Sequence, residues 1–209
     1  GLGDVSGDGV PDFVATHPAA LLAGGGDILS GVDGSVLNSI GGGGFSADDY
    51  ATSATRLGDV DGDGFSDVAL GAPGEFGNTG RVRVYSGATG MNLYTLNGLG
   101  QDELFGVRVQ SIDDVNADGA DDLAISALGF AGVGQVRVFS GTNGTSLYDV
   151  TGTASPQNLG QSLARMEDID GDGIGDFLVG DSAVHDLGQG TVHLISGANG
   201  DIIQSIEGN

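Results

Sequence analysis

Short apolar runs separated by Gly and Asp recur along the chain and predict β-strands. In its second quarter, an alternating run at 50–57 is followed by a compact run at 67–71, an alternating run at 82–86 and a last run at 93–96. Alternation with a period of two marks a half-buried strand, and a compact run of four or five apolar residues marks a buried one. No stretch has the spacing of an amphipathic helix. The pattern therefore predicts four short strands in this quarter.

The same succession recurs in the other quarters of the chain, so each is predicted to be an antiparallel meander. Gly and Asn or Asp bracket the turn after each third strand, which is the chemistry of a hairpin. These turns lie at 30–34, 86–90, 140–144 and 196–200. In the first quarter Gly25 and Gly26 stand where the second has Arg81 and Val82. We therefore expect an irregular chain at 19–26.

A nine-residue loop from Asp59 to Asp67 precedes the compact run and places carboxylates at positions 1, 3, 5 and 9. Gly62 and Gly64 permit the tight bend that brings these side chains together. Converging hard oxygen ligands suit Ca²⁺, which takes about 6–8 of them. The loop occurs four times, at intervals of 55, 55 and 54 residues. Positions 1, 3, 5 and 9 are Asp4, Ser6, Asp8 and Asp12; Asp59, Asp61, Asp63 and Asp67; Asp114, Asn116, Asp118 and Asp122; Asp168, Asp170, Asp172 and Asp176.

A repeat of about 55 residues with four strands favours a β-propeller blade over a solenoid coil. The fold class is therefore all-β, with blades at 1–44, 45–98, 99–152 and 153–209. The first blade lacks its first strand, because three residues before Asp4 are too few to form one. The four blades close by themselves, belong to a larger ring, or are completed by a neighbouring subunit; the sequence leaves these alternatives open.

Two short motifs flank the loops and resemble the FG-GAP repeats of the integrin alpha-subunit propeller and of many bacterial surface proteins. Phe105-Gly106 precedes the third loop, and Gly71-Ala72-Pro73 follows the second. The resemblance implies a Ca²⁺ site between the first two strands of each blade, up to four in all. It also implies that a backbone carbonyl at position 7 is a ligand, from Val10, Phe65, Ala120 and Ile174. The loops with four Asp ligands, the second and the fourth, are expected to bind most tightly.

An EF-hand is excluded, because it needs a Glu at position 12 and a helix on each side of its loop. Position 12 is occupied by Ala15, Leu70, Ile125 and Val179, all within predicted strands. Asp- and Gly-rich turns that hold no metal are a further alternative. Four uncompensated carboxylates at one point repel one another, which argues against it.

The net charge of -23 argues against nucleic acid or an anionic membrane surface as a partner. Cys is absent, which removes the class of disulfide-built domains. No apolar run approaches the roughly 20 residues of a membrane span. The sequence begins at Gly1 rather than Met, so a processed product, a fragment or a partial sequence is expected.

No constellation of catalytic residues stands out. His17, His185 and His193 show no paired base and nucleophile in the sequence. Arg81, Arg83 and Arg137 lie on third strands, where they form either a ligand-facing basic strip or a protected strand edge.

The sequence thus predicts a non-catalytic, calcium-binding propeller module at the cell surface or outside the cell, for adhesion or for recognition of a protein or glycan. An alternative is a self-assembling subunit of an extracellular ring or filament, with blades completed between subunits. A polysaccharide-active enzyme is a further alternative, because some calcium propellers resemble polysaccharide lyases.

Overall fold

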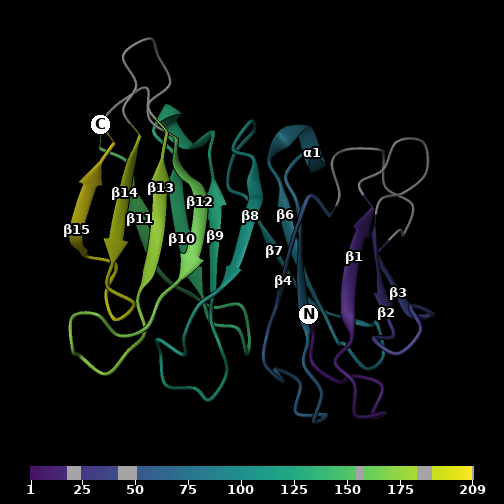
Figure 1. Ribbon diagram of the computed structural model, residues 1–209. Coiled ribbons are helices and arrows are strands. Elements are labelled where there is room, and N and C mark those ends of the chain that lie inside the picture. The colour runs from purple at the N-terminus through teal and green to yellow at the C-terminus, as the bar shows by residue number, and fades with distance from the viewer. Residues whose placement is uncertain (18–24, 42–50, 154–157, 183–189, 209) are drawn as a thin grey trace.

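The computed structural model describes residues 1–17, 25–41, 51–153, 158–182 and 190–208. Antiparallel strands form four sheets that stand side by side as blades (Figure 1). Blade 1 contains β1 (Phe13–His17), β2 (Gly25–Leu29) and β3 (Val36–Gly41). Blade 2 contains β4 (Ser53–Arg56), β5 (Val68–Ala72), β6 (Arg81–Tyr85) and β7 (Asn92–Asn97). Blade 3 contains β8 (Phe105–Ser111), β9 (Leu123–Ala127), β10 (Gln135–Phe139) and β11 (Ser146–Thr151), and blade 4 contains β12 (Leu159–Arg165), β13 (Phe177–Asp181), β14 (Thr191–Ile195) and β15 (Ile202–Glu207).

Each blade is a meander in which consecutive strands are hydrogen-bonded neighbours, so the predicted all-β fold is confirmed. Two short helical turns, α1 (Glu75–Asn78) and η1 (Phe130–Gly132), join second to third strands in blades 2 and 3. Blade 1 has three strands among the described residues, as predicted. Its N-terminal residues pair with the residue that precedes β1, through an isolated bridge between Gly3 and Asp12. No helix in the described part of the chain is long and apolar enough to span a membrane.

The prediction of an irregular chain at 19–26 is wrong for its last two residues. Gly25 and Gly26 lie in β2 and pair with both neighbouring strands of blade 1. Residues 19–24 lie outside the described residues. Glycine is required at position 25, because a side chain there would come within 2.7 Å of the Ile40 carbonyl oxygen. The packing of β3 therefore excludes a side chain there.

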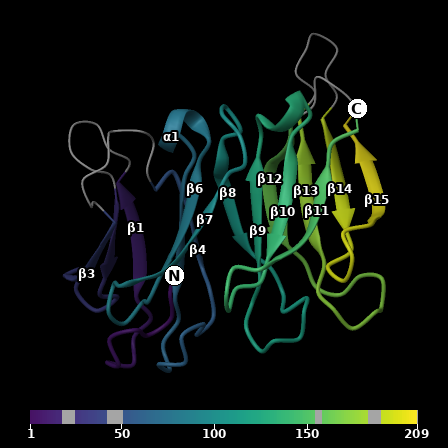
Figure 2. The ribbon, with the colours of Figure 1, turned by 180° about the vertical axis from the view of Figure 1, so that it is seen from behind.

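The hydrophobic core lies mainly between blades rather than within them. One cluster joins Val82 and Leu96 of blade 2 to Phe105 and Ile125 of blade 3. Two further clusters occupy the interfaces between blades 1 and 2 and between blades 3 and 4. The first strands also meet across the interfaces, because β8 contacts β4 on one side and β12 on the other (Figure 2). Each blade therefore depends on its neighbours for burial of its apolar faces.

The two glycine motifs meet across the interface between blades 2 and 3. Gly106 has a φ of +91°, and a side chain there would come within 2.6 Å of the Arg81 carbonyl oxygen. A side chain on Gly71 would collide with the Gly106 carbonyl. That carbonyl instead accepts a hydrogen bond of 2.8 Å from the Ser53 hydroxyl. The aromatic-Gly pair of one blade and the Gly-Ala-Pro segment of the preceding blade are thus two sides of one close contact.

Phe105 tests how much stability the blade 2–blade 3 interface contributes. Its ring is fully buried and packs edge-on against Phe139, with centroids 5.9 Å apart. Phe105→Ala is expected to lower the free energy of unfolding by about 3–5 kcal/mol, because it removes a large buried side chain and leaves a cavity. Urea unfolding followed by circular dichroism measures this change.

Phe76→Ala is the matched control, because the Phe76 ring is 56% exposed and contacts the Arg81 guanidinium at 3.8 Å. Its expected cost is less than about 1 kcal/mol. Equal losses of stability in the two variants would contradict a core located between the blades.

Candidate metal centres

The four Asp-rich loops lie at the same end of the blades, the lower end in Figure 1. Three of them connect a first strand to a second strand: β4 to β5, β8 to β9 and β12 to β13. The first loop leads from the N-terminal residues into β1. The opposite end of the blades carries α1 and η1 (Figure 1).

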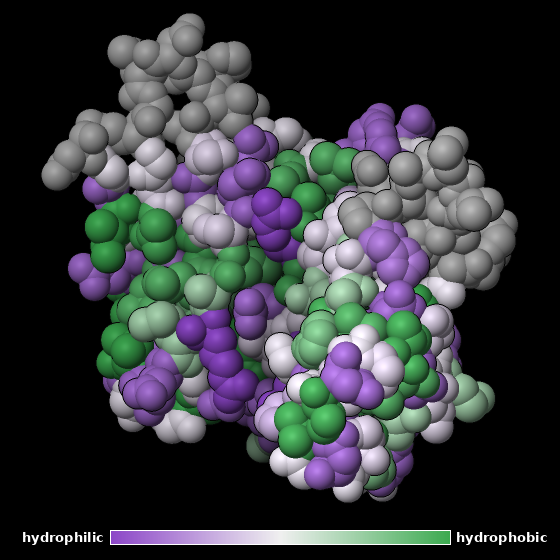
Figure 3. Space-filling view, turned by 45° about the vertical axis from the view of Figure 1, so that its right-hand side comes forward, coloured by the Kyte–Doolittle hydropathy of each residue, from purple (hydrophilic) through white to green (hydrophobic). Residues whose placement is uncertain are grey.

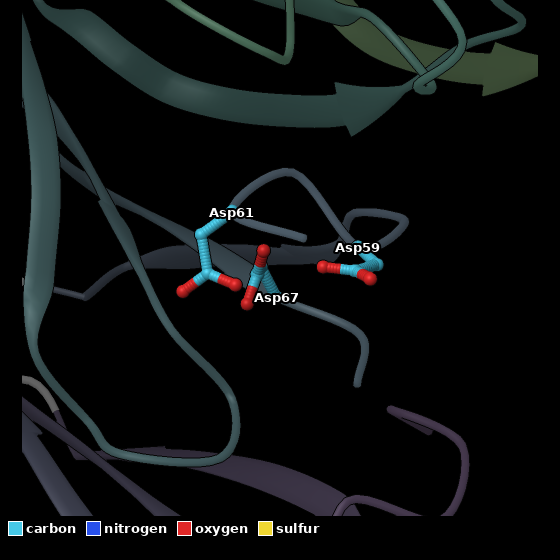
Figure 4. Close-up of side chains that lie close together, drawn as sticks. All are labelled: Asp59, Asp61 and Asp67. Carbon is cyan, nitrogen blue, oxygen red and sulfur yellow. The ribbon is translucent and has the colours of Figure 1, made fainter. Parts of the chain in front are cut away.

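Three loops each bring three carboxylates close enough to hold one cation. Within each group the candidate ligand oxygens all lie within 4.8 Å of one another. Figure 4 shows the group in blade 2, where the side chains of Asp59 and Asp61 lie on either side of Asp67. The groups are Asp59, Asp61 and Asp67; Asp114, Asp118 and Asp122; and Asp168, Asp170 and Asp176.

The predicted ligands do not all converge in the described residues. Asp63 and Asp172 stand outside the groups of their loops, and Asp4, Asp8 and Asp12 of the first loop form no such group. The backbone carbonyls at position 7 stay a prediction. Asn116, at position 3 of the third loop, donates a hydrogen bond of 2.9 Å to Asp118. An amide there replaces one negative charge by a donor, and in this blade Asp118, at position 5, belongs to the group of carboxylates.

Backbone N–H groups fix the carboxylate at position 1 in each loop. In blade 2, Asp59 Oδ1 accepts the N–H of Gly62 at 2.7 Å, and Oδ2 accepts that of Gly64 at 2.8 Å. These glycines have φ angles of +80° and +92°, in the left-handed region that glycine adopts without strain. The loop is therefore curled around Asp59 by its own amides, which explains why Gly recurs at position 6 in all four loops and at position 4 in all but the third, where Ala117 has a φ of +58°.

The carboxylate at position 9 ties the loop to a distant turn of the same blade. In blade 3, Asp122 Oδ2 accepts the Val115 N–H at 2.8 Å, and Oδ1 accepts the Gly141 N–H at 3.0 Å. Gly141 belongs to the turn that follows the third strand. The same two bonds recur in the other blades, with Asp12, Asp67 and Asp176 as acceptors.

Burial and like charges disfavour ionisation of two of these carboxylates. Burial raises the pKa of Asp67 to about 6, and the nearby charges of Asp61 and Asp63 add to the effect. Burial likewise raises the pKa of Asp122 to about 6, with Asp118 and Asp114 as the like charges. Two backbone N–H bonds to each carboxylate act in the opposite direction. A cation among these oxygens would remove the repulsion that raises both pKa values.

The first loop differs in its electrostatics. Burial disfavours the charge of Asp12, but hydrogen bonds from the N–H groups of Gly31, Val5 and Ser6 outweigh it and lower the pKa. Ser6 stands at position 3 and donates a 3.3 Å hydrogen bond to Asp4. With one charge fewer and its carboxylates stabilised by the protein itself, this loop has less need of a cation than the others.

Hydroxyl groups of the turn are part of the blade 3 site and were not recognised in the sequence. Ser140 and Thr142 donate hydrogen bonds of 2.7 Å and 2.8 Å to the two oxygens of Asp118. In blade 2, Ser86 lies 3.4 Å from an oxygen of Asp63. The recurrence of Ser at the start of each turn, at Ser30, Ser86, Ser140 and Ser196, is the sequence signal that points to them. Side chains of the turn therefore orient loop carboxylates across the blade.

The chemistry of the donors fits a hard divalent cation. Every side-chain ligand in the three groups is a carboxylate oxygen, and such oxygens suit Ca²⁺ or Mg²⁺ rather than softer metals. In each group one carboxylate belongs to a buried Asp, and the other two belong to Asp residues that are mostly exposed. The groups could therefore hold a cation without rearrangement of the strands.

Two of the three arginines of the third strands, Arg83 and Arg137, neither form a ligand-facing strip nor protect a strand edge. Arg137 is buried, forms an ion pair with the buried Glu103 and lies over the rings of Phe105 and Phe130. Arg83 makes a two-pronged contact with Glu75, at 2.8 Å and 2.9 Å. Both interpretations are therefore wrong for these two residues. Glu75 begins α1, and Glu103 lies in the segment between β7 and β8.

The histidines show no catalytic arrangement in the described residues. His17 ends β1 and lies 3.6 Å from Asp27. His193 shares a 2.8 Å hydrogen bond with Ser205 on the neighbouring strand. His185 lies outside the described residues.

Comparison with known proteins places these features in a family context. Residues 51–85, which contain the second loop, match the family described as FG-GAP repeat. Integrin alpha-5 of Xenopus laevis is 32% identical over 86% of this chain, and integrin alpha-V of Gallus gallus is 29% identical over 86%. The chain spans 19% of the length of each of these relatives.

Solved structures share the fold at low sequence identity. Rhamnogalacturonan lyase YesW matches 98% of this chain with a TM-score of 0.55 and 18% identity, and the chain covers 50% of it. The Dos1 propeller matches 89% of this chain with a TM-score of 0.52 and 13% identity, and the chain covers 44% of it. The family match and the four blades confirm the resemblance expected from the sequence. The chain is a β-propeller that contains an FG-GAP repeat and is similar in sequence to integrin alpha subunits.

Proposed function

We propose that this chain is a non-catalytic, calcium-binding recognition module that acts outside the cell or at its surface. The observation that carries the proposal is the convergence of three carboxylates in each of three loops within an FG-GAP propeller. Its role is adhesion, through binding of a protein or a glycan. The similarity to integrin alpha subunits supports this role.

Calcium is the proposed ion because it accepts many oxygen ligands in an adaptable geometry. The side-chain ligands are those at positions 1, 3, 5 and 9 of the loops, with the carbonyl at position 7. Extracellular calcium modules bind with dissociation constants of about 10⁻⁴–10⁻³ M, which external calcium can fill. Blades 2 and 4 are proposed to bind most tightly, and the first loop least tightly, because of its Ser6 and the hydrogen bonds to Asp12.

The proposed role of the ion is structural. The position-9 carboxylate connects the loop to the turn after the third strand, so a cation bound to it stabilises both. Neutralising clustered carboxylates also lowers the repulsion within a chain of net charge -23. That charge disfavours nucleic acid as a partner.

The recognition surface is proposed to lie at the end of the blades opposite the calcium loops. Connecting segments there vary between blades, whereas the calcium loops repeat. A cavity of about 250 Å³ at this end is lined by Leu99, Gln101, Glu103 and Phe130 among others. Apolar and aromatic side chains beside a buried ion pair suit a protein ligand. Enzymatic activity is not proposed, since the lyase shares only the fold and the described residues hold no catalytic constellation.

Calcium is expected to raise the melting temperature of the chain. A site with a dissociation constant of 10⁻⁴–10⁻³ M contributes about 1.4–2.7 kcal/mol at roughly 10 mM free calcium. Differential scanning calorimetry with 10 mM calcium and with excess EGTA measures the shift. Identical melting curves under the two conditions would refute calcium binding.

Asp61→Asn should reduce this stabilisation by about one site's share, because it removes a ligand charge without changing the size of the side chain. Isothermal titration calorimetry should show one fewer bound ion. Asp201→Asn is the matched control: Asp201 is exposed, and its residue lies in the turn after β14, outside every loop. The proposal fails at this site if both variants bind as much calcium as the wild type.

Proton competition should weaken calcium binding between about pH 6 and pH 4. Asp67 and Asp122 have folded-state pKa values of about 6, against an ordinary value of 3.8. In the metal-free protein both carboxyls stabilise the fold most below pH 4, and this contribution is lost as the pH rises to 6. Calcium requires the ionised form, so the shift in melting temperature that it causes should be full at pH 7.5 and much smaller at pH 5. Scans at both pH values measure it, and an equal shift would contradict these pKa values.

A further inference from the structure

The metal loops of neighbouring blades approach one another at a repeated pair of positions. The residue just before position 1 of one loop faces the residue at position 8 of the next blade's loop. A side chain on Gly3 would lie 3.8 Å from the Ser66 hydroxyl oxygen, and one on Gly58 would lie 4.0 Å from the Asp121 nitrogen. Glycine precedes position 1 in blades 1 and 2, so at these two interfaces that residue has no side chain with which to bridge the loops.

Between blades 3 and 4 the same two positions are joined by a hydrogen bond. Asp113 stands just before position 1 of the third loop, and Gly175 stands at position 8 of the fourth. Asp113 Oδ2 accepts the Gly175 N–H at 3.0 Å. A side chain on Gly175 would come within 2.7 Å of that oxygen, so glycine permits the contact. Asp113 of blade 3 therefore holds the backbone of the loop that carries the blade 4 carboxylates.

An arginine of blade 4 binds the same carboxylate through its other oxygen. Arg165 ends β12, three residues before Asp168. Its Nη2 donates to Asp113 Oδ1 at 2.8 Å, and its Nη1 donates to Asp121 Oδ2 at 3.0 Å. The Ser111 hydroxyl also donates to Asp121, at 3.2 Å. Each ion pair is partly exposed and contributes little alone, but the planar guanidinium fixes both carboxylates at once.

This bridge, formed by Asp113, Asp121, Arg165 and Gly175, lies directly beside two candidate metal groups. Each of its three loop residues immediately precedes a carboxylate of one of the groups. The pairs are Asp113 and Asp114, Asp121 and Asp122, and Gly175 and Asp176. Polar contacts of this kind suit the lower end of the molecule, where Figure 3 shows hydrophilic residues mixed with hydrophobic ones. A shift of a carboxylate in one loop therefore reaches the other loop through the bridge.

We propose that Asp113 is a positioning residue for the calcium site of blade 4, and that Asp113 and Arg165 couple this site to the site of blade 3. This coupling rests on the proposed calcium binding and extends it from single sites to a linked pair. A cation in one loop orders the bridge, so the second cation meets a loop that has already lost part of its conformational freedom. The effect is reciprocal, because each ion raises the affinity for the other by the same factor.

Arg165 sets the charge of the bridge as well as its geometry. Asp113 and Asp121 stand outside the three carboxylate groups of the described residues, and the guanidinium compensates part of their charge. A neutral residue in its place would leave more negative charge near both sites, which raises their attraction for calcium. Loss of the bridge removes the dependence of one site on the other. A variant at Arg165 therefore separates a general charge effect, seen in the affinities, from the coupling.

The first test measures amide hydrogen exchange at Gly175 in the metal-free chain, in excess EGTA. Asp113→Ala removes the acceptor of the Gly175 N–H, so this amide is expected to exchange about fivefold faster. The fold should tolerate the variant, because glycine occupies the same position in blades 1 and 2. Glu167→Ala is the matched control: Glu167 is exposed and stands just before position 1 of the fourth loop. Unchanged exchange in Asp113→Ala, or equal acceleration in both variants, would overturn the positioning role without any calcium in the experiment.

The second test is a calcium titration followed by NMR. The amide signals of Gly64, Gly119 and Gly173, at position 6 of the second, third and fourth loops, report each site separately. Asp113→Ala is expected to raise the midpoint at Gly173 about tenfold and to leave Gly64 unchanged, because it removes a residue that orients a metal loop. Glu167→Ala should change the Gly173 midpoint much less. Equal Gly173 midpoints in wild type and Asp113→Ala, or an equal rise in both variants, would overturn the proposal. No shift at any of the three glycines would refute the calcium binding itself, and the coupling with it.

The third test measures the coupling. Asp114→Asn disables the third site and is expected to raise the midpoint at Gly173 about fivefold in an otherwise wild-type chain. The same substitution should have no effect at Gly173 when it is combined with Asp113→Ala or Arg165→Gln, because the bridge is then broken. An effect that persists in both combinations would overturn the coupling, whatever the affinities of the single sites.

The interface between blades 2 and 3 supplies the matched control within the chain. Gly58 stands there at the position of Asp113, so the second and third loops lack the carboxylate of the bridge. Asp59→Asn disables the second site and should leave the calcium midpoint at Gly119 unchanged. A rise at Gly119 as large as the rise that Asp114→Asn causes in the fourth loop would show that the sites influence one another without the bridge, and would overturn the proposal.

Discussion

The carboxylate at position 9 of each loop is the interaction on which the rest of a blade depends. In blade 3, Asp122 accepts one N–H from its own loop and one from Gly141, 19 residues later in the chain. The carbonyl of Gly141 then accepts the hydroxyl of Tyr94 from the preceding blade. One residue, Gly141, therefore connects the candidate metal site to the interface between blades. Loss of the Asp122 charge, or a shift of its side chain, would therefore disturb its own loop, the turn at Gly141 and the contact of that turn with Tyr94 of the preceding blade.

The strands and loops could be predicted from the sequence because both follow from local patterns that recur. Alternating apolar residues set the faces of the sheets, and the spacing of Asp and Gly set the bends around Asp59 and its counterparts. The repeat also placed the turns correctly, because Gly with a positive φ is needed at their ends. The two glycines at positions 25 and 26 led to a wrong prediction of irregular chain, because close contact with β3, and not a turn, accounts for glycine inside this strand.

The pairing of Arg83 and Arg137 with buried carboxylates could not be predicted, because their partners do not recur with the blade. Glu75 precedes β6 in its own blade, whereas Glu103 belongs to the segment between blades 2 and 3. The two arginines align in the sequence while their carboxylates do not, so no repeat pattern pairs them. Ser140 and Thr142 posed a similar difficulty, since their contact with Asp118 joins segments more than 20 residues apart.

The location of the core between blades has a consequence for how such a chain changes its length. Each interface is built from corresponding positions of two adjacent blades, so the free energy of folding is approximately a sum of terms for single blades and for neighbouring pairs of blades. Duplication of one segment of about 55 residues inserts a blade together with a ready-made interface on each side. Duplication or deletion of such a segment can therefore lengthen or shorten the row of blades without any new contact having to arise by mutation.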